Sequence, residues 1–170
     1  MHARPQPNEA ASYYSRYIDL VPGADILAEF KKQGEETAKF LATISEEKSL
    51  HRYGPDKWTI RELLNHVNDC ERIFLFRAFW FARGFTEPLP GFDQDACVQA
   101  AQANDVSWAD HVAEFNALRL TSLSLFGNLP EQAWSRTGTA NDTVFTVRAL
   151  AYIIAGHVSH HVSVIKQRYL

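Results

Sequence analysis

Four long segments of this sequence repeat apolar residues at alternating steps of three and four positions, the spacing that gives a helix one apolar face. They span about 24–44, 59–83, 107–126 and 143–170. No segment alternates apolar and polar residues with the period of two that a half-buried strand requires. Four such helices in a chain of 170 residues predict an all-α fold, a four-helix bundle, because each apolar face must be buried against the others.

Capping residues indicate where two of these helices begin and end. Thr59 and Glu62 form the S/T-x-x-E pattern of a capping box, and Ser107 opens the third helix in a similar way. Gly84 and Gly127 follow these two helices, and a glycine commonly marks the end of a helix. The connecting stretches expected to be loops, or in the second case partly helical, are 86–91, 92–103 and 137–142.

The first 22 residues differ in composition from the rest, with three prolines and the closely spaced Tyr13, Tyr14 and Tyr17. A disordered tail seldom holds so many aromatic residues. We therefore expect an N-terminal arm, residues 1–22, packed on a bundle formed by residues 23–170. The tyrosines are candidates for covering a pocket, although packing alone also accounts for them.

Charge and composition exclude several classes of function. The chain has 17 Lys and Arg against 20 Asp and Glu, a net charge of -3, which does not suit a protein that binds nucleic acid by neutralising phosphates. No apolar run approaches the roughly 20 residues of a membrane-spanning helix. Two cysteines make no disulfide framework, and the first residues lack the apolar stretch of a secretory signal. The cytoplasm is the expected compartment, with neither nucleic acid nor membrane as a partner.

Histidines interrupt the apolar faces of two predicted helices. His157 and His161 lie on the inward row of the last helix, one turn apart, where two imidazoles can share one metal ion. His66 occupies the inward row of the second helix, which continues to Arg77. If these helices are neighbours, three imidazoles meet at one divalent metal and leave coordination positions open, as a catalytic site requires. The alternative is three hydrogen-bonded core histidines.

Several neighbours of these histidines have two interpretations each. Cys70, one turn after His66, would close the site as a fourth ligand, or it is a small buried apolar residue. His160 is rotated by about 100° around the helix axis from His161, so it is expected to face a neighbouring helix or the surface. Asp69 and Glu71 belong to a solvated face, unless one of them orients a ligand imidazole.

Charged residues elsewhere are candidates for binding a substrate or cofactor. Arg119, on the inward row of the third helix, suits the carboxylate of a thiol cofactor or substrate; alternatively it extends to solvent. Asp93 and Asp95 border the pocket or are simple turn residues. The histidines that follow no pattern, and are expected at the surface, are His2, His51 and His111.

The sequence also contains recognisable motifs. They are Trp58–His66 (WTIRELLNH), Gly156–His161 (GHVSHH) and the loop Pro88–Asp95 (PLPGFDQD). The two helix motifs resemble those of the DinB-like, damage-inducible superfamily, and the loop and the leader Arg4–Pro22 are similar to one branch of it. The resemblance covers nearly the whole chain, and the combined motifs are more specific than a lone HxxxH.

The resemblance implies a bundle with a three-histidine metal site whose ligands are His66, His157 and His161. Members of the superfamily include bacillithiol S-transferases and a mycothiol-dependent maleylpyruvate isomerase. This implies a low-molecular-weight thiol, bound as thiolate, that attacks a small electrophile. Zn or Ni is the expected metal, and Fe or Mn is also compatible with three imidazoles. A homodimer is expected from the same likeness.

Three functions remain open at this point. The first is a metal-dependent thiol S-transferase or hydrolase acting on a small electrophile. The second is a non-catalytic protein with a structural metal, and the third is a metal-free helical interaction module. For either metal-binding function the ligand imidazoles must be neutral, so the ordinary pKa of histidine predicts release of the metal below about pH 6.

Overall fold

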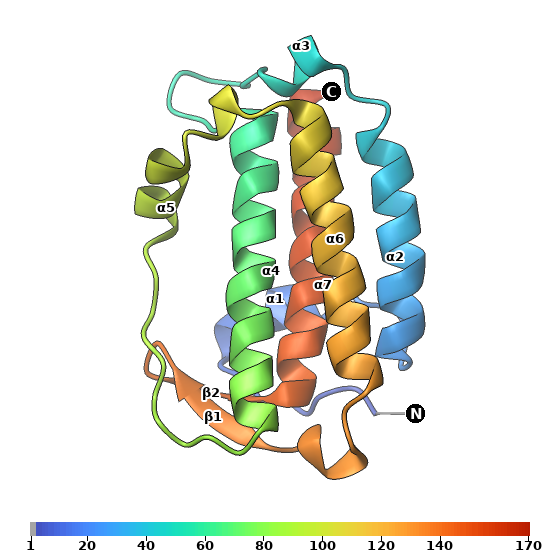
Figure 1. The fold of residues 1–170 in the computed structure, drawn as a ribbon, viewed down its shortest axis with the longest axis vertical. Helices are drawn as coiled ribbons and strands as arrows, with labels where there is room; N and C mark the ends of the chain where they lie inside the picture. The colour runs from blue at the N-terminus through green and yellow to red at the C-terminus, as the bar shows by residue number, and fades with distance from the viewer. Residues whose placement is uncertain (1–2) are drawn as a thin grey trace.

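The computed structural model describes residues 3–170, and four long helices form its body (Figure 1). They are α2 (Ile26–Leu41), α4 (Ile60–Ala82), α6 (Trp108–Gly127) and α7 (Val147–Val164). The predicted four-helix bundle is confirmed, and so is the capping box at the start of α4. Within the described residues, every helix is too short or too polar to cross a membrane.

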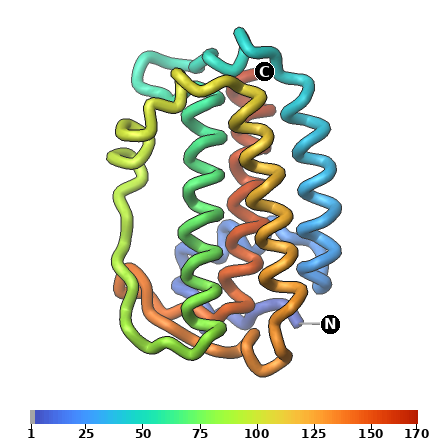
Figure 2. The backbone as a smooth tube through the Cα atoms, viewed as in Figure 1, coloured from blue at the N-terminus to red at the C-terminus, as the bar shows by residue number. Residues whose placement is uncertain are grey.

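The four helices do not simply alternate in direction. In Figure 1, α2 and α7 run upward and α4 and α6 run downward, because a long connection returns the chain to the upper end before α6 begins (Figure 2). This connection carries α5 (Gln94–Ala101) and a 3-10 turn, η2 (Ala103–Asp105), past the side of α4. As a result α4 contacts both α6 and α7, and α2 contacts the same two helices.

A β-hairpin closes the lower end of the bundle and was not predicted. Strands β1 (Thr137–Ala140) and β2 (Thr143–Thr146) pair antiparallel and lead directly into α7. The predicted loop at 137–142 and the helix start near position 143 are therefore wrong. Asn141 and Asp142 adopt φ angles of 50° and 54°, the backbone of a two-residue type I′ turn, which matches the twist of paired strands.

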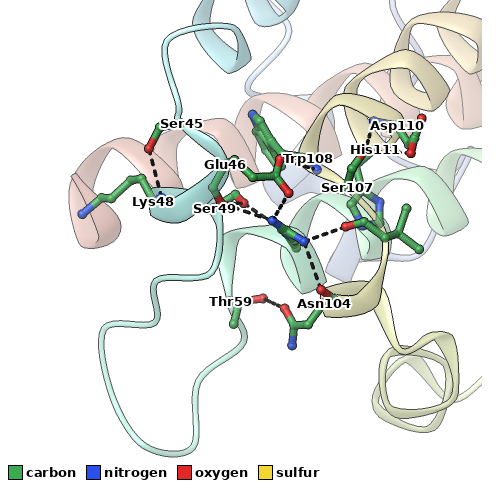
Figure 3. A network of polar contacts seen from close by, with 12 residues as sticks. Ser45, Glu46, Lys48, Ser49, Thr59, Asn104, Ser107, Trp108, Asp110 and His111 are labelled. Atoms are coloured by element: carbon green, nitrogen blue, oxygen red, sulfur yellow. Dashed lines mark hydrogen bonds and ion pairs between the residues drawn. The ribbon is translucent and has the colours of Figure 1, made fainter.

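A polar network holds the connections at the upper end (Figure 3). At its centre is the buried guanidinium of Arg61 on the first turn of α4. It donates to Ser49 Oγ at 2.7 Å and to the carbonyls of Asn104 and Val106 at 3.0 and 2.7 Å, and it pairs with Glu46. This one side chain thereby fixes both connections to α4. The bundle also contains the short elements α3 (Glu46–Ser49), η3 (Glu131–Ala133) and η4, a π-helical turn (Ile165–Tyr169).

The apolar core is divided into two clusters, one toward each end of the bundle. Phe30 and Phe126 belong to the cluster near the hairpin, and Leu41 and Phe115 belong to the other. The buried positions also include a set of glycine, polar and charged residues, which we call the polar layer. Its members are Gly34 and Thr37 in α2, His66, Asn68 and Glu71 in α4, Arg119 and Ser122 in α6, and His157 in α7.

The N-terminal arm lies against α7 and the hairpin. It contains a 3-10 turn, η1 (Ser12–Tyr14), and the short helix α1 (Ser15–Ile18), which packs on α7. Glu9 accepts a hydrogen bond from Thr146 Oγ1 at 2.7 Å and pairs with Arg148. These contacts attach the arm at the point where the hairpin passes into α7.

Gly156 allows the arm to approach α7 closely. A Cβ atom at Gly156 would overlap the carbonyl group of Tyr17, so we expect Gly156→Ala to displace the arm and to lower the free energy of unfolding by roughly 1–3 kcal/mol. Limited proteolysis should then cleave the arm faster than in the unchanged protein. Gly127→Ala is the control, because a Cβ there meets no atom within 4 Å. Equal effects of both substitutions would contradict the close contact.

Candidate metal centre

The three histidines singled out in the sequence meet at one edge of the polar layer, to which His66 and His157 belong. The rings of His157 and His161 have centroids 4.4 Å apart on α7, and the ring of His66 on α4 lies 5.1 and 5.0 Å from them. One ring nitrogen from each residue lies within 4.8 Å of the others. The helices that carry them are neighbours, which is the arrangement that convergence of the three rings requires.

Burial keeps these imidazoles neutral. His66 and His157 are 3% and 5% exposed, and His161 is half-buried. Burial lowers the pKa of His66 from 6.5 to about 4, against a small opposing effect of Asp95, and lowers the pKa of His161 to about 3. The pKa of His157 lies well below its usual value, first through burial and then through the neighbouring histidines. A neutral ring nitrogen is the form that binds a metal.

The hydrogen bonding of the three rings is incomplete. Among residues 3–170 the ring nitrogens of His66 have one polar partner, Cys70 Sγ, at 3.6 and 3.7 Å. His161 Nδ1 is buried and has no hydrogen-bond partner in residues 3–170. His157 Nε2 and His161 Nε2 face each other at 3.1 Å, near the roughly 3.3 Å that separates two nitrogens bound to one tetrahedral zinc. Because this spacing and the mutual closeness of one nitrogen from each ring match a common coordination sphere, the three residues fit a shared metal ion.

Cavities open on both sides of the cluster. The hairpin-side cavity, of about 390 Å³, is lined by His157 together with Ala11, Tyr13, Tyr14, Tyr17, Cys70, Phe74, Arg77, Phe92, Gln94, Asn141 and Thr143. The C-terminal cavity, of about 340 Å³, is lined by His161 and by Asp95, His160 and Tyr169 among others. A structural zinc site is closed, whereas a catalytic site keeps a position open. Access from two sides is therefore typical of the catalytic kind.

Two side chains next to the cluster do not join it. Cys70 Sγ is not among the mutually close ligand atoms in the described chain. Burial raises the pKa of its thiol to about 12, so the thiol is protonated in the metal-free protein. His160 faces the ring of Tyr17, 5.6 Å away, and borders the C-terminal cavity.

Glu71 and Arg119 face each other inside the bundle, Arg119 on the inward row that was expected for it. They form a buried ion pair, 3.1 Å long, between α4 and α6, and Ser122 donates to Glu71 at 2.7 Å. The expectation of a solvated Glu71 is wrong, since it is 2% exposed. Arg119 is 3% exposed and lines neither cavity, so its guanidinium faces a protein carboxylate and not a ligand. Asp69 pairs with Arg72 and not with a histidine.

The two aspartates after the PLPG loop have separate roles. Asp93 caps α5 by accepting hydrogen bonds from the backbone N–H groups of Asp95 and Ala96, at 2.9 and 3.1 Å. Turn chemistry therefore accounts for Asp93. Asp95 is exposed, borders the C-terminal cavity and acts on the charge of His66.

The histidines that follow no pattern were all expected at the surface, and the structure agrees for one of the two that it describes. His51 is exposed, as expected, and His2 lies outside the described residues. The prediction that His111 lies at the surface is wrong: it is 2% exposed, and its Nε2 is 2.8 Å from the carbonyl oxygen of Ala103. This bond ties α6 to the turn η2.

Arg77 is a candidate that the sequence analysis missed, although it lies on the same row of α4 as His66. Its side chain is 3% exposed, lines the hairpin-side cavity and donates to the carbonyl of Pro90 at 3.0 Å. An arginine on an inward row is itself unusual, because arginines are seldom fully buried without a partner. That pattern is the feature that could have drawn attention to it.

Comparison with known proteins agrees with this architecture. The chain is similar in structure to YfiT from Bacillus subtilis, described as "a probable metal-dependent hydrolase with an unusual four-helix bundle topology", with a TM-score of 0.68 and 16% sequence identity. The match covers 98% of this chain and 91% of that chain. At this level of identity it establishes the fold. No curated protein sequence matches the chain significantly.

The sequence also matches a protein family. The matched stretch, residues 29–165, is that of the DinB superfamily. It includes nearly all of the four bundle helices and all three clustered histidines. The chain therefore belongs to the DinB superfamily.

Proposed function

We propose that this protein is a divalent-metal-dependent enzyme in which His66, His157 and His161 hold the metal. The observation that carries the proposal is the convergence of three neutral imidazoles with incomplete hydrogen bonds between two cavities. When bound, a divalent metal supplies Lewis-acid chemistry and lowers the pKa of a coordinated water or thiol. Membership in the DinB superfamily and the likeness to YfiT support the proposal.

The reaction is hydrolysis of a small electrophile, or transfer of a low-molecular-weight thiol to it, and the hairpin-side cavity receives that electrophile. Burial raises the pKa of Tyr14 and of Tyr17, so both phenols stay protonated and are available as hydrogen-bond donors to a ligand. Phe74 and Phe92 supply apolar walls, and the arm limits the access of water. Within residues 3–170 the carboxylate beside the cluster is Asp95, in the C-terminal cavity.

Metal content and water exchange test this function. Protein purified without a histidine tag should contain close to one divalent ion per chain, with Zn or Ni the leading candidates. The Mn-loaded protein should speed the relaxation of solvent protons, as an open coordination position requires. Hydrolysis of an ester panel, or consumption of a thiol in the presence of an electrophile, should depend on added metal.

Two results would overturn the enzymatic function. A tightly held metal without exchangeable water, whose removal greatly lowers Tm, would indicate a structural site. Metal at background level in a normally folded protein would indicate a metal-free interaction module. The proposal is supported if the purified protein holds its divalent ion, if water exchanges at that ion, and if turnover depends on the metal.

Acid should release the metal at a lower pH than the ordinary pKa of histidine predicts. Because burial holds the pKa of His66 near 4 and that of His161 near 3, protons compete with the metal only as the pH approaches these values. We expect full occupancy at pH 6 and loss as the pH approaches about 4. Equilibrium dialysis in steps of pH, followed by elemental analysis, measures the release.

Circular dichroism at each pH separates release from unfolding. The unfolded chain takes up protons on these histidines near pH 6.5, whereas the folded chain does so only near pH 4 or below. The metal-free protein therefore loses stability as the pH falls through this window, by up to a few kcal/mol. Complete release already at pH 6.5, or full occupancy at pH 3, would contradict the three-histidine site.

A further inference from the structure

Arg77 differs from the other buried arginines in lacking a counter-charge. Arg61, Arg77 and Arg119 are each 3–5% exposed in the described chain, and the first and third each pair with a glutamate. In residues 3–170 no carboxylate lies within ion-pair distance of Arg77. It donates to Pro90 and lies 5.8 Å from the ring centroid of Phe74. An uncompensated buried charge is costly, so the missing anion requires an explanation.

The hairpin-side cavity suits a ligand with one negative charge and an apolar body. The ring of Phe74 stands 6.1 Å from that of His157 and 5.8 Å from Arg77 Cζ, between the histidine cluster and the guanidinium. Apart from Arg77, no Lys, Arg, Asp or Glu of the described residues lines it. Its walls are aromatic rings, three of which are phenols, together with two amides, the Thr143 hydroxyl, the Cys70 thiol and Ala11. A volume of about 390 Å³ is at the lower end for small-molecule sites.

The guanidinium of Arg77 is held in place, and most of its N–H donors remain available to a ligand. Within residues 3–170 its one hydrogen bond, to Pro90, engages one of the five N–H donors of the guanidinium. The loop that carries Pro90 is itself fixed to the hairpin: Leu89 donates to Thr139 at 2.9 Å and accepts from Asn141 at 3.0 Å. The remaining donors of Arg77 are therefore presented to the cavity by a braced support.

We propose that Arg77 binds a carboxylate group of the substrate, so that the site selects small carboxylates with an apolar or aromatic body. The proposal rests on the proposed function, because it places the reacting end of the same ligand at the histidine cluster. The planar fork of a guanidinium matches a carboxylate. A single arginine also matches the single charge of a carboxylate, whereas a phosphate group carries nearly two at neutral pH.

The test compares 3-phenylpropanoate with its uncharged analogue, 3-phenylpropanamide, by calorimetric titration of metal-free and zinc-loaded protein. In the metal-free protein the acid should bind about 10-fold tighter than the amide or better, as a charge-assisted pair of hydrogen bonds provides. Arg77→Gln should abolish this preference, and Arg77→Lys should keep part of it. Arg83→Gln is the control, since Arg83 is exposed at the end of the same helix and does not line the cavity.

Equal binding of acid and amide by the unchanged metal-free protein would overturn the proposal, and so would an unaltered preference in Arg77→Gln. If Arg77→Gln does not fold, the Nε–H signal of Arg77 in the unchanged protein should shift with the acid and not with the amide; an unmoved signal overturns the proposal equally. Absence of metal from the purified protein would refute the proposed enzyme but would leave the acid preference of the metal-free protein in place. The two failures are thus distinguishable.

Discussion

His161→Ala is expected to abolish stoichiometric binding of a divalent metal. Only His66 and His157 would remain, and two imidazoles hold a divalent ion much more weakly than three. Loss of a group that merely orients a ligand already costs about 10- to 100-fold in metal affinity, so loss of the ligand itself should cost more than about 100-fold. Competition with a chromophoric chelator measures the change.

His160→Ala is the matched control. The ring of His160 is 4.9 Å from that of His161 on the same helix, but His160 is not one of the three histidines whose ring nitrogens lie close together. Its metal affinity should stay within a few-fold of the unchanged protein. Metal at 100 times its Kd should raise the free energy of unfolding of this variant by about 2.7 kcal/mol, and should leave His161→Ala unaffected. Unchanged metal content in His161→Ala would refute the ligand assignment.

The histidine cluster could be anticipated because helix geometry alone determines which residues share a row. His157 and His161 are one turn apart, so they must project together, and His66 lies on the inward row of another helix. The only further condition was contact between α4 and α7, which the structure satisfies. The fold class follows in the same way, from periodicity that leaves four apolar faces to bury.

The Glu71–Arg119 pair could not be anticipated in this way, because α4 has two buried faces. One row, with His66 and Cys70, faces α7; the next, with Asn68 and Glu71, faces α6. The second face exists because the long connection brings α6 down beside α4, a path that periodicity does not specify. The single inward row assumed for α4 left Glu71 on a solvated face.

The hairpin was missed for a local reason. Thr137–Ala140 and Thr143–Thr146 are each only four residues long, too short for alternation to be evident. The Asn141–Asp142 pair between them suits the two positive φ angles of a tight hairpin turn. The turn residues, and not the strands, were the feature that could have predicted it.

Glu71→Gln is expected to lower the free energy of unfolding by about 3–5 kcal/mol. Arg119 would remain buried without its counter-charge, and its Nε and Nη1 already lack hydrogen-bond partners among residues 3–170. Burial lowers the pKa of Arg119, and Glu71 opposes this effect, so the carboxylate is what makes the buried cation tolerable. The ring of Phe30, 4.8 Å from Arg119 Cζ, offers a weaker attraction. Urea unfolding followed by circular dichroism measures the change.

Two further variants separate the unpaired charge from other effects of the substitution. The double variant Glu71→Leu with Arg119→Met removes both charges and should be as stable as the unchanged protein, or more stable by about 1–4 kcal/mol. Asp69→Asn removes the partly exposed pair with Arg72 and should cost at most about 1 kcal/mol. If Glu71→Gln costs no more than Asp69→Asn, the buried pair does not hold α4 against α6. The two apolar clusters on either side would then fix these helices without the polar layer.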